Sequence, residues 1–178
     1  MTGSPSGRLP SGNPPGGVWP SDLALVYTSQ TGKSVWREVG HFESESGGEI
    51  RIARHLADSG YDVVLRGTMR APEVVTPDAW VIGAGRVEPW ELKRISTRAR
   101  NVQGAVQHAL REGKYQAPQV VVFLDRVVTE HEVNAGMAAA MRADLGKRLR
   151  SVIFVRQDGT IQVITREAYY SGQRFRLH

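Results

Sequence analysis

The stretch TPDAWVIGAGRVEPWELKR, Thr76 to Arg94, holds the pattern that decides the fold. Two runs typical of β-strands, Asp78–Gly83 and Val87–Ile95, flank the dipeptide Ala84-Gly85 in this region. A dipeptide containing glycine between two such runs favours a tight turn. The sequence therefore predicts an antiparallel hairpin with charged side chains near its open end.

The charged residues of this hairpin fall on one face if the register is regular. A turn centred between Ala84 and Gly85 sets Asp78 directly opposite Glu91, with the two Cβ atoms about 5 Å apart. Lys93 shares that face with Glu91 because side chains alternate along a strand. Two opposed carboxylates repel unless a cation lies between them. We therefore predict a divalent-metal site, for Mg²⁺ first and for Mn²⁺ or Zn²⁺ as alternatives, with both carboxylates as ligands.

Pro89 is the residue that challenges this register. Proline cannot donate to the ladder and is found in strands mostly at edges or bulges. A bulge would shift the partner of Glu91 by one residue and leave Glu88 as a second candidate acid. The regular register remains the prediction, with Lys93 placed to orient or activate an attacking water.

The segment from Ser46 to Ser59 predicts an amphipathic helix that ends at Gly60. Its apolar stripe consists of Ile52, Ala53, Leu56 and Ala57. Glu49 belongs to the same stripe, where an unpaired carboxylate is costly. We therefore expect Glu49 to have a partner and to be a third acid of the site, although a helix N-terminal acid interacting with the helix dipole is an equal alternative.

The remaining elements complete an α/β domain with a mixed sheet flanked by helices. Asp22–Tyr27 is either a short strand or an entry segment. After the first helix we expect strand Tyr61–Leu65, the hairpin, helix Thr97–Glu112, strand Gln119–Asp125, helix Glu130–Leu145, and strands Ser151–Arg156 and Thr160–Thr165. Residues 1–21, rich in Gly, Ser and Pro, predict a flexible leader, and residues 22–178 a single domain with its core at about 43–167.

Composition narrows the class of partner. The net charge of +5 and the sequence pI of about 9.9 favour an anionic partner such as nucleic acid. Basic residues follow the hairpin and recur in GKRLR, Gly146–Arg150, although solvated helix faces are an equal alternative for each run. The absence of cysteine excludes thiolate metal sites and thiol enzymes. We find no secretion signal and no membrane span, and expect a soluble chain.

These features together resemble the PD-(D/E)XK nuclease superfamily. Its signature would be Pro77-Asp78, then Glu91-Leu92-Lys93, preceded by Glu49 on the first helix, and its α-β-β-β-α-β core matches the predicted order. A narrower resemblance, over about Glu43 to Glu167, is to the C-terminal tRNA nuclease domain of CdiA-type contact-dependent growth inhibition toxins. It rests on EIRIARHLADSGYDVVL, on the hairpin, on NVQGAVQHA and on the closing DGTIQVI.

The resemblance implies a metal-dependent RNase that cuts tRNA and a cognate immunity protein as partner. As a toxin the chain would be secreted or delivered into the cytoplasm of a target cell; otherwise we expect a cytoplasmic protein. Carried over by position, the catalytic residues would be Glu49, Asp78, Glu91, Lys93 and, more weakly, Gln107. Arg94, Arg98 and Arg100 would hold the phosphate backbone. Two alternatives remain: a DNA nuclease of the same fold, and a non-catalytic nuclease-like module for binding or phage structure.

Overall fold

The structure is a computed structural model, and it describes residues 9–10, 12–14, 17–20, 22–41, 48–67 and 76–178. The strands within these residues are β1 Ala24–Thr28, β2 Ser34–Arg37, β3 Asp62–Leu65, β4 Ala79–Gly83, β5 Arg86–Ile95, β6 Gln119–Leu124, β7 Ser151–Arg156 and β8 Ile161–Thr165. The helices are α1 Glu49–Asp58, α2 Val102–Gly113, α3 Glu130–Ala143 and α4 Arg166–Tyr170.

The described strands form one mixed sheet in which spatial order equals chain order, β1 to β8. Strand β3 pairs antiparallel with β4, and β4 with β5, whereas β5, β6 and β7 run parallel. Strands β2 and β3 are also parallel, and the outermost pairs, β1 with β2 and β7 with β8, are antiparallel. The parallel pairs are joined through helices, as the crossover between parallel strands requires.

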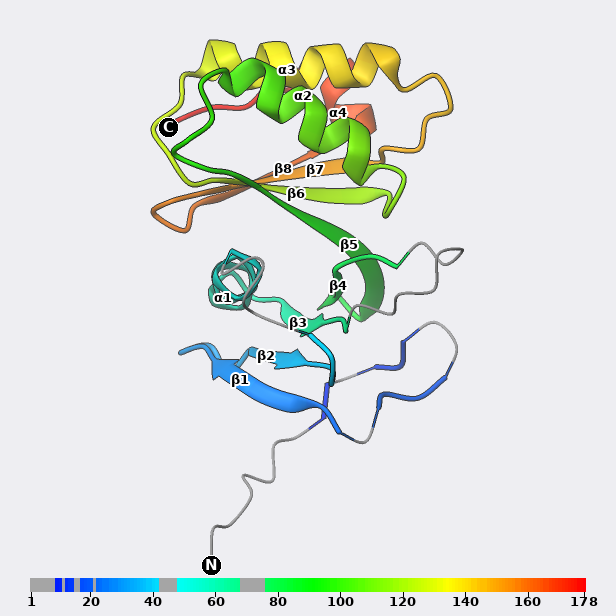
Figure 1. Cartoon of the computed structure of the whole chain (residues 1–178). Helices are drawn as coiled ribbons and strands as arrows, with labels where there is room; N and C mark the ends of the chain where they lie inside the picture. Colours follow the sequence, from blue (N-terminus) through cyan, green and yellow to red (C-terminus); the bar gives the residue numbers. More distant parts are fainter. Residues whose placement is uncertain (1–8, 11, 15–16, 21, 42–47, 68–75) are drawn as a thin grey trace, which may run out of the picture.

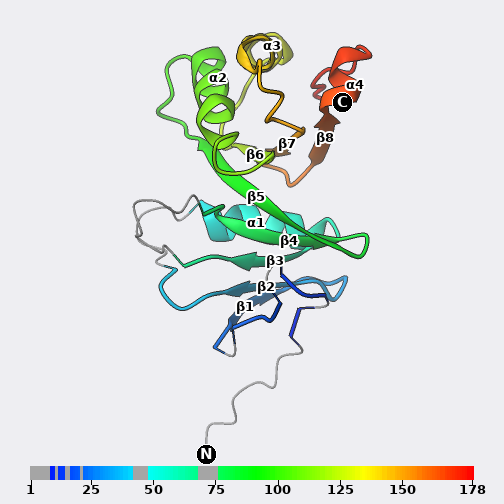
Figure 2. The same ribbon diagram turned by 90° about the vertical axis from the view of Figure 1, so that its right-hand side faces the viewer.

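Helices cover both faces of the sheet (Figures 1 and 2). Helices α2 and α3 pack side by side on the face that Val120, Val122 and Leu124 present from β6. Helix α1 packs on the opposite face against Val121 and Phe123 of the same strand. Strand β6 is therefore buried on both faces, which explains its continuous apolar run.

The predicted order of elements after Ser46 is confirmed up to β8, and the structure adds two elements. Strand β2 and helix α4 were not predicted, and the uncertain segment Asp22–Tyr27 overlaps strand β1. SVWR, the sequence of β2, is too short to show periodicity and becomes a strand by pairing with β3. Residues 46–47, where the first helix was expected to begin, lie outside the described residues. In the described part of the chain no helix is long and apolar enough to cross a membrane.

Trp19, from the predicted leader, belongs to the folded unit. Its side chain is 7% exposed and packs in a small cluster with Trp36, Val64 and Ile82. Its indole Nε1 donates to the Gly12 carbonyl over 2.6 Å. Residues 1–8, 11, 15–16 and 21 of the predicted leader lie outside the described residues.

Candidate active site

The β4–β5 hairpin has the predicted register. Ala84 and Gly85 both have positive φ angles, 49° and 75°, which is the type I′ geometry that matches the twist of a hairpin. Ala79 pairs with Trp90, so Asp78, the residue before β4, lies opposite Glu91. The register derived from the turn therefore holds to the open end of the hairpin.

Pro89 introduces no bulge between β4 and β5, where it pairs with Trp80. In an antiparallel ladder every second pair exchanges hydrogen bonds, and the pair flanking a two-residue turn is a bonded one. Counted from Gly83 and Arg86, Pro89 falls at a non-bonded pair, so its nitrogen points away from β4. On that other side β6 begins only opposite Trp90. The missing N–H therefore costs the sheet no ladder bond.

Asp78, Glu91 and Lys93 converge on one face of the hairpin. The backbone N–H of Leu92 donates to Asp78 Oδ2 over 2.9 Å. Lys93 Nζ donates to Glu91 Oε1 over 2.6 Å, and the lysine side chain stays 31% exposed whereas that of Glu91 is only 4% exposed. The other oxygen, Glu91 Oε2, is buried and has no hydrogen bond of standard geometry within the described residues, although the backbone and carboxyl of Asp78 lie close enough to lower the pKa of Glu91.

Both carboxyl groups are held in surroundings that disfavour their charged forms. Burial, followed by the negative charge of Glu91, raises the pKa of Asp78 to about 7, against the opposing effect of the Leu92 N–H. Burial also raises the pKa of Glu91, against the opposing effect of Lys93. A pair of carboxyls with raised pKa values in a half-buried site is typical of functional sites.

The donor set fits a divalent cation held by two carboxylates. Among the described residues no group of three His, Asp or Glu side chains gathers in a metal-holding arrangement. Mg²⁺ does not require one, since it keeps several waters and is commonly bound by one or two carboxylates plus substrate phosphates. Glu91 Oε2, buried beside Asp78 and without a hydrogen bond of standard geometry in the described part of the chain, is the atom that such an ion would satisfy.

Glu49 lies near the pair but has a different direct partner. It is the first residue of α1, and its Oε2 lies 2.7 Å from Nε2 of His41. Its negative charge still contributes to the raised pKa of Asp78. The expectation that Glu49 needs a partner is thus met by His41, a buried residue that the sequence analysis did not single out. A lone histidine eight residues before the acid offered no recognisable spacing.

The predicted basic residues do not share one environment. Arg94 lies on the face opposite Lys93, where its Nε and Nη2 donate to Asp125 Oδ2 over 2.9 and 2.5 Å. Arg51 of α1 donates to the other oxygen of Asp125 over 3.1 Å. By contrast, Arg98 and Arg100 are exposed in the loop between β5 and α2 and form no ion pair within the described residues.

The two weaker candidates are not connected to the acid pair. Glu88 pairs with Val81 and points to the face opposite Glu91, because it lies an odd number of residues away on the same strand. Gln107 is half-buried on α2 and forms no hydrogen bond within the described part of the chain. Of the predicted residues, the hairpin therefore brings together Asp78, Glu91 and Lys93.

Two carboxyl groups and a lysine on one face of a hairpin thus form a candidate site for a divalent cation, and comparison with known proteins finds a family model that matches this part of the chain. Residues 75–161, just under half of the chain, match the family model of the contact-dependent growth inhibition CdiA C-terminal domain. The matched region contains Asp78, Glu91 and Lys93 and excludes Glu49.

Two further comparisons complete the picture. No match is found among curated proteins. A solved structure, the CdiA-CT/CdiI toxin and immunity complex from Burkholderia pseudomallei, is similar at 24% sequence identity with a TM-score of 0.44, over 72% of this chain and 92% of that chain.

Proposed function

We propose that the chain is a toxin domain with metal-dependent endonuclease activity of the PD-(D/E)XK kind, acting on RNA and foremost on tRNA. The observation that carries the proposal is the convergence of Asp78, Glu91 and Lys93 at the open end of the hairpin. The family match supports it, because the matched residues 75–161 include all three side chains.

Each residue has a chemical role in this proposal. Asp78 and Glu91 would hold a divalent ion, which when bound supplies charge stabilisation at the phosphate and a more acidic water. Lys93 is fixed by Glu91 yet 31% exposed, so its ammonium can hold the attacking water or donate to a phosphate oxygen. Glu49, held by His41, adds negative charge near Asp78 and so strengthens the attraction for a cation.

Substrate and partner follow from the family match and the charge. A chain of net charge +5 with exposed Arg98 and Arg100 in the loop between β5 and α2 suits a phosphate backbone. Contact-dependent growth inhibition involves delivery of a toxin into a target cell, and its producer needs protection from the same activity. We therefore expect a cognate immunity protein that blocks the acid pair, and action in the cytoplasm of the target cell.

A cleavage assay tests the proposal. The purified protein is incubated with total tRNA and with duplex DNA, in Mg²⁺, Mn²⁺, Zn²⁺ or EDTA. We expect tRNA cleavage that EDTA abolishes, and at least about a 100-fold loss of rate for Glu91→Gln and for Lys93→Met, since each removes a charge-stabilising group. Cleavage of DNA alone would select the DNA nuclease, and cleavage of neither substrate with any ion would select the non-catalytic module.

Glu88→Gln is the matched control for this assay. It makes the same chemical change on the same strand as Glu91→Gln, but on the opposite face of the sheet. The control variant is expected to retain at least about half of the wild-type rate, because surface changes away from a site have small effects. Equal losses in both glutamine variants would show that the effect is not specific to the acid pair.

A further inference from the structure

The loops that follow α2 and α3 form a basic pocket, which we call the Tyr115 pocket. It has a volume of about 380 Å³ and is lined by Lys114, Tyr115, Lys147, Arg148, Arg150 and residues 116–118. The two loops are joined by the N–H groups of Arg150 and Ser151, which donate to the Pro118 carbonyl over 2.8 and 3.3 Å. They lie together at the end of the sheet where β6 and β7 begin (Figure 1).

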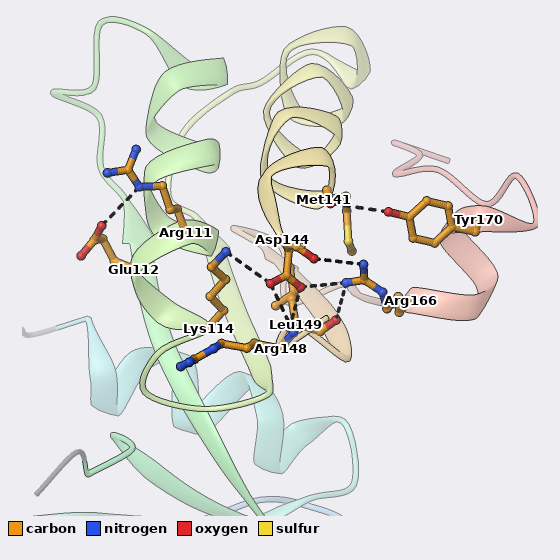
Figure 3. Close-up of polar contacts among 9 residues, drawn as sticks. All are labelled: Arg111, Glu112, Lys114, Met141, Asp144, Arg148, Leu149, Arg166 and Tyr170. Atoms are coloured by element: carbon orange, nitrogen blue, oxygen red, sulfur yellow. Dashed lines mark hydrogen bonds and ion pairs between the residues drawn. The ribbon is translucent and has the colours of Figure 1, made fainter. Parts of the chain in front are cut away.

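Asp144 anchors the second loop, the one that follows α3, through several polar contacts (Figure 3). Its carboxylate, 1% exposed, accepts the backbone N–H groups of Arg148 and Leu149 over 3.2 and 2.9 Å. It also pairs with Lys114 at 3.3 Å and with Arg166 at 2.7 Å. Two backbone N–H groups and two cationic side chains therefore bind the same buried carboxylate. This network holds the backbone of the loop in one conformation, from which Lys147, Arg148 and Arg150 project.

Three cations of this loop, Lys147, Arg148 and Arg150, have no acidic partner within the described residues. All three are exposed. The guanidinium of Arg148 lies over the ring of Tyr115, 5.0 Å from its centroid, and Tyr115 is itself 52% exposed. Lys147 has a φ angle of 50°, a conformation that glycine adopts without cost and lysine does not. The pocket therefore concentrates uncompensated positive charge beside an exposed aromatic ring.

The Tyr115 pocket begins beside the acid pair. Gly113, the residue before Lys114, packs so closely on the sheet that a Cβ atom there would lie 3.5 Å from Cγ of Glu91. Arg98 and Arg100, which are exposed and have no ion pair among the residues described, precede α2, whereas the pocket follows it. A helix of 12 residues is about 18 Å long, so the two basic groups lie at opposite ends of α2. A polyanion that contacts both groups has to run along this side of the molecule.

We propose that the Tyr115 pocket binds backbone phosphates of the RNA strand next to the cleavage site. This inference rests on the proposed function for the choice of RNA. Lys147 and Arg150 contact the phosphates, and Arg148 does so from its position on Tyr115. Clustered cations with an interleaved exposed aromatic residue are the usual means of holding single-stranded nucleic acid. Proximity to Glu91 favours the substrate as occupant over an acidic surface of another protein.

Binding of fluorescently labelled total tRNA, measured by anisotropy in EDTA, tests the pocket without cleavage. The variant is Lys147→Glu/Arg150→Glu, with Lys147→Ala/Arg150→Ala as a second. At about 100 mM salt we expect at least about a tenfold rise in Kd for the charge reversal and a smaller rise for the alanine variant. The slope of log affinity against log salt concentration should become shallower by about 1.5, because two phosphate contacts are lost.

The control is Arg54→Glu/Arg86→Glu, which makes the same change in net charge at two exposed cations outside the pocket. Its Kd for tRNA should rise less than about threefold, since it changes only the long-range field. Equal effects of pocket and control variants, or no effect of the pocket variant, would overturn the proposal. Melting temperatures of all variants verify that each is folded.

Two further readouts separate this proposal from others. Poly-glutamate is the probe for an acidic protein: if the pocket variant loses poly-glutamate binding and keeps tRNA binding, the pocket is a protein site and the RNA proposal is wrong. A wild-type protein that binds tRNA through the pocket yet cleaves nothing with any divalent ion would remove the nuclease proposal and leave the pocket as an RNA-binding site.

Discussion

The backbone N–H of Leu92 donates over 2.9 Å to Oδ2 of Asp78, the residue immediately before β4. The aspartate side chain here takes the place of the carbonyl that a longer β4 would offer to β5. This bond holds the Asp78 carboxyl beside Glu91, where burial and the neighbouring negative charge raise the pKa of Asp78 to about 7. The position of the acid and its unusual titration thus have one structural origin.

The protein without metal should lose stability as the pH rises from about 4 to about 7. With its pKa raised to about 7 in the fold, Asp78 retains a proton that the unfolded chain releases near the ordinary aspartate pKa of 3.8. The contribution of Asp78 to the free energy of unfolding is therefore fully present below its pKa in the unfolded chain. It is lost as the pH rises through its pKa in the folded protein. Thermal unfolding in EDTA at several pH values measures this dependence. Asp78→Asn should make the pH dependence of stability weaker, and Glu91 should account for the part that remains. Identical pH dependences for the wild type and the variant would contradict the raised pKa of Asp78.

Variants of Arg94 should affect stability, whereas variants of Arg98 and Arg100 should affect RNA binding. Arg94→Ala removes two bonds to Asp125, which is 5% exposed, and should lower the free energy of unfolding by about 1–3 kcal/mol with little change in tRNA affinity. Arg98→Ala/Arg100→Ala should leave stability within about 0.5 kcal/mol and weaken tRNA binding. Denaturant unfolding and anisotropy measure the two effects. A loss of tRNA affinity without a loss of stability in Arg94→Ala would show that Arg94 contacts the nucleic acid.

Gly113→Ala should loosen the contact between α2 and the acid pair. The added Cβ would lie 2.8 and 2.9 Å from the two methyl groups of Val120, and overpacking of this kind costs about 1–3 kcal/mol. Val120→Ala removes the clashing methyl groups at the expense of a cavity. The double variant should therefore be more stable than the sum of the single effects by about 1 kcal/mol. Strict additivity would mean that α2 does not rest on Val120.

Trp19→Ala should destabilise the domain by about 3 kcal/mol, although the residue lies in a segment of linker-like composition. The side chain is 7% exposed and packs against Trp36 and Ile82. Val18 is 86% exposed, so Val18→Ala is the neighbouring control and should change stability by less than about 0.5 kcal/mol. Chemical denaturation of both variants compares them, and equal stabilities would place Trp19 outside the core.

Local rules were sufficient for the hairpin and its acids. A two-residue turn fixes which residues are opposed, and strand alternation fixes which share a face, so Asp78, Glu91 and Lys93 could be placed together from spacing alone. Whether Pro89 would disturb the sheet could not be predicted from spacing, because it depends on where the neighbouring strand β6 begins, and tertiary structure decides that. The helical stripe of α1 and the apolar run of β6 were readable for the same reason, since periodicity reflects which faces are buried.

Tertiary structure decided what those local rules could not reach. Strand β2 exists because β3 pairs with it, and Trp19 is buried because a cluster of distant side chains receives it. Arg94 pairs with Asp125, and Glu49 pairs with His41. The spacing of these residues in the sequence predicts neither contact. The sequence by itself determined which charged residues share a hairpin face; the packing of helices on the sheet decided how deeply they are buried, and burial is the largest cause of the raised pKa values of the acid pair.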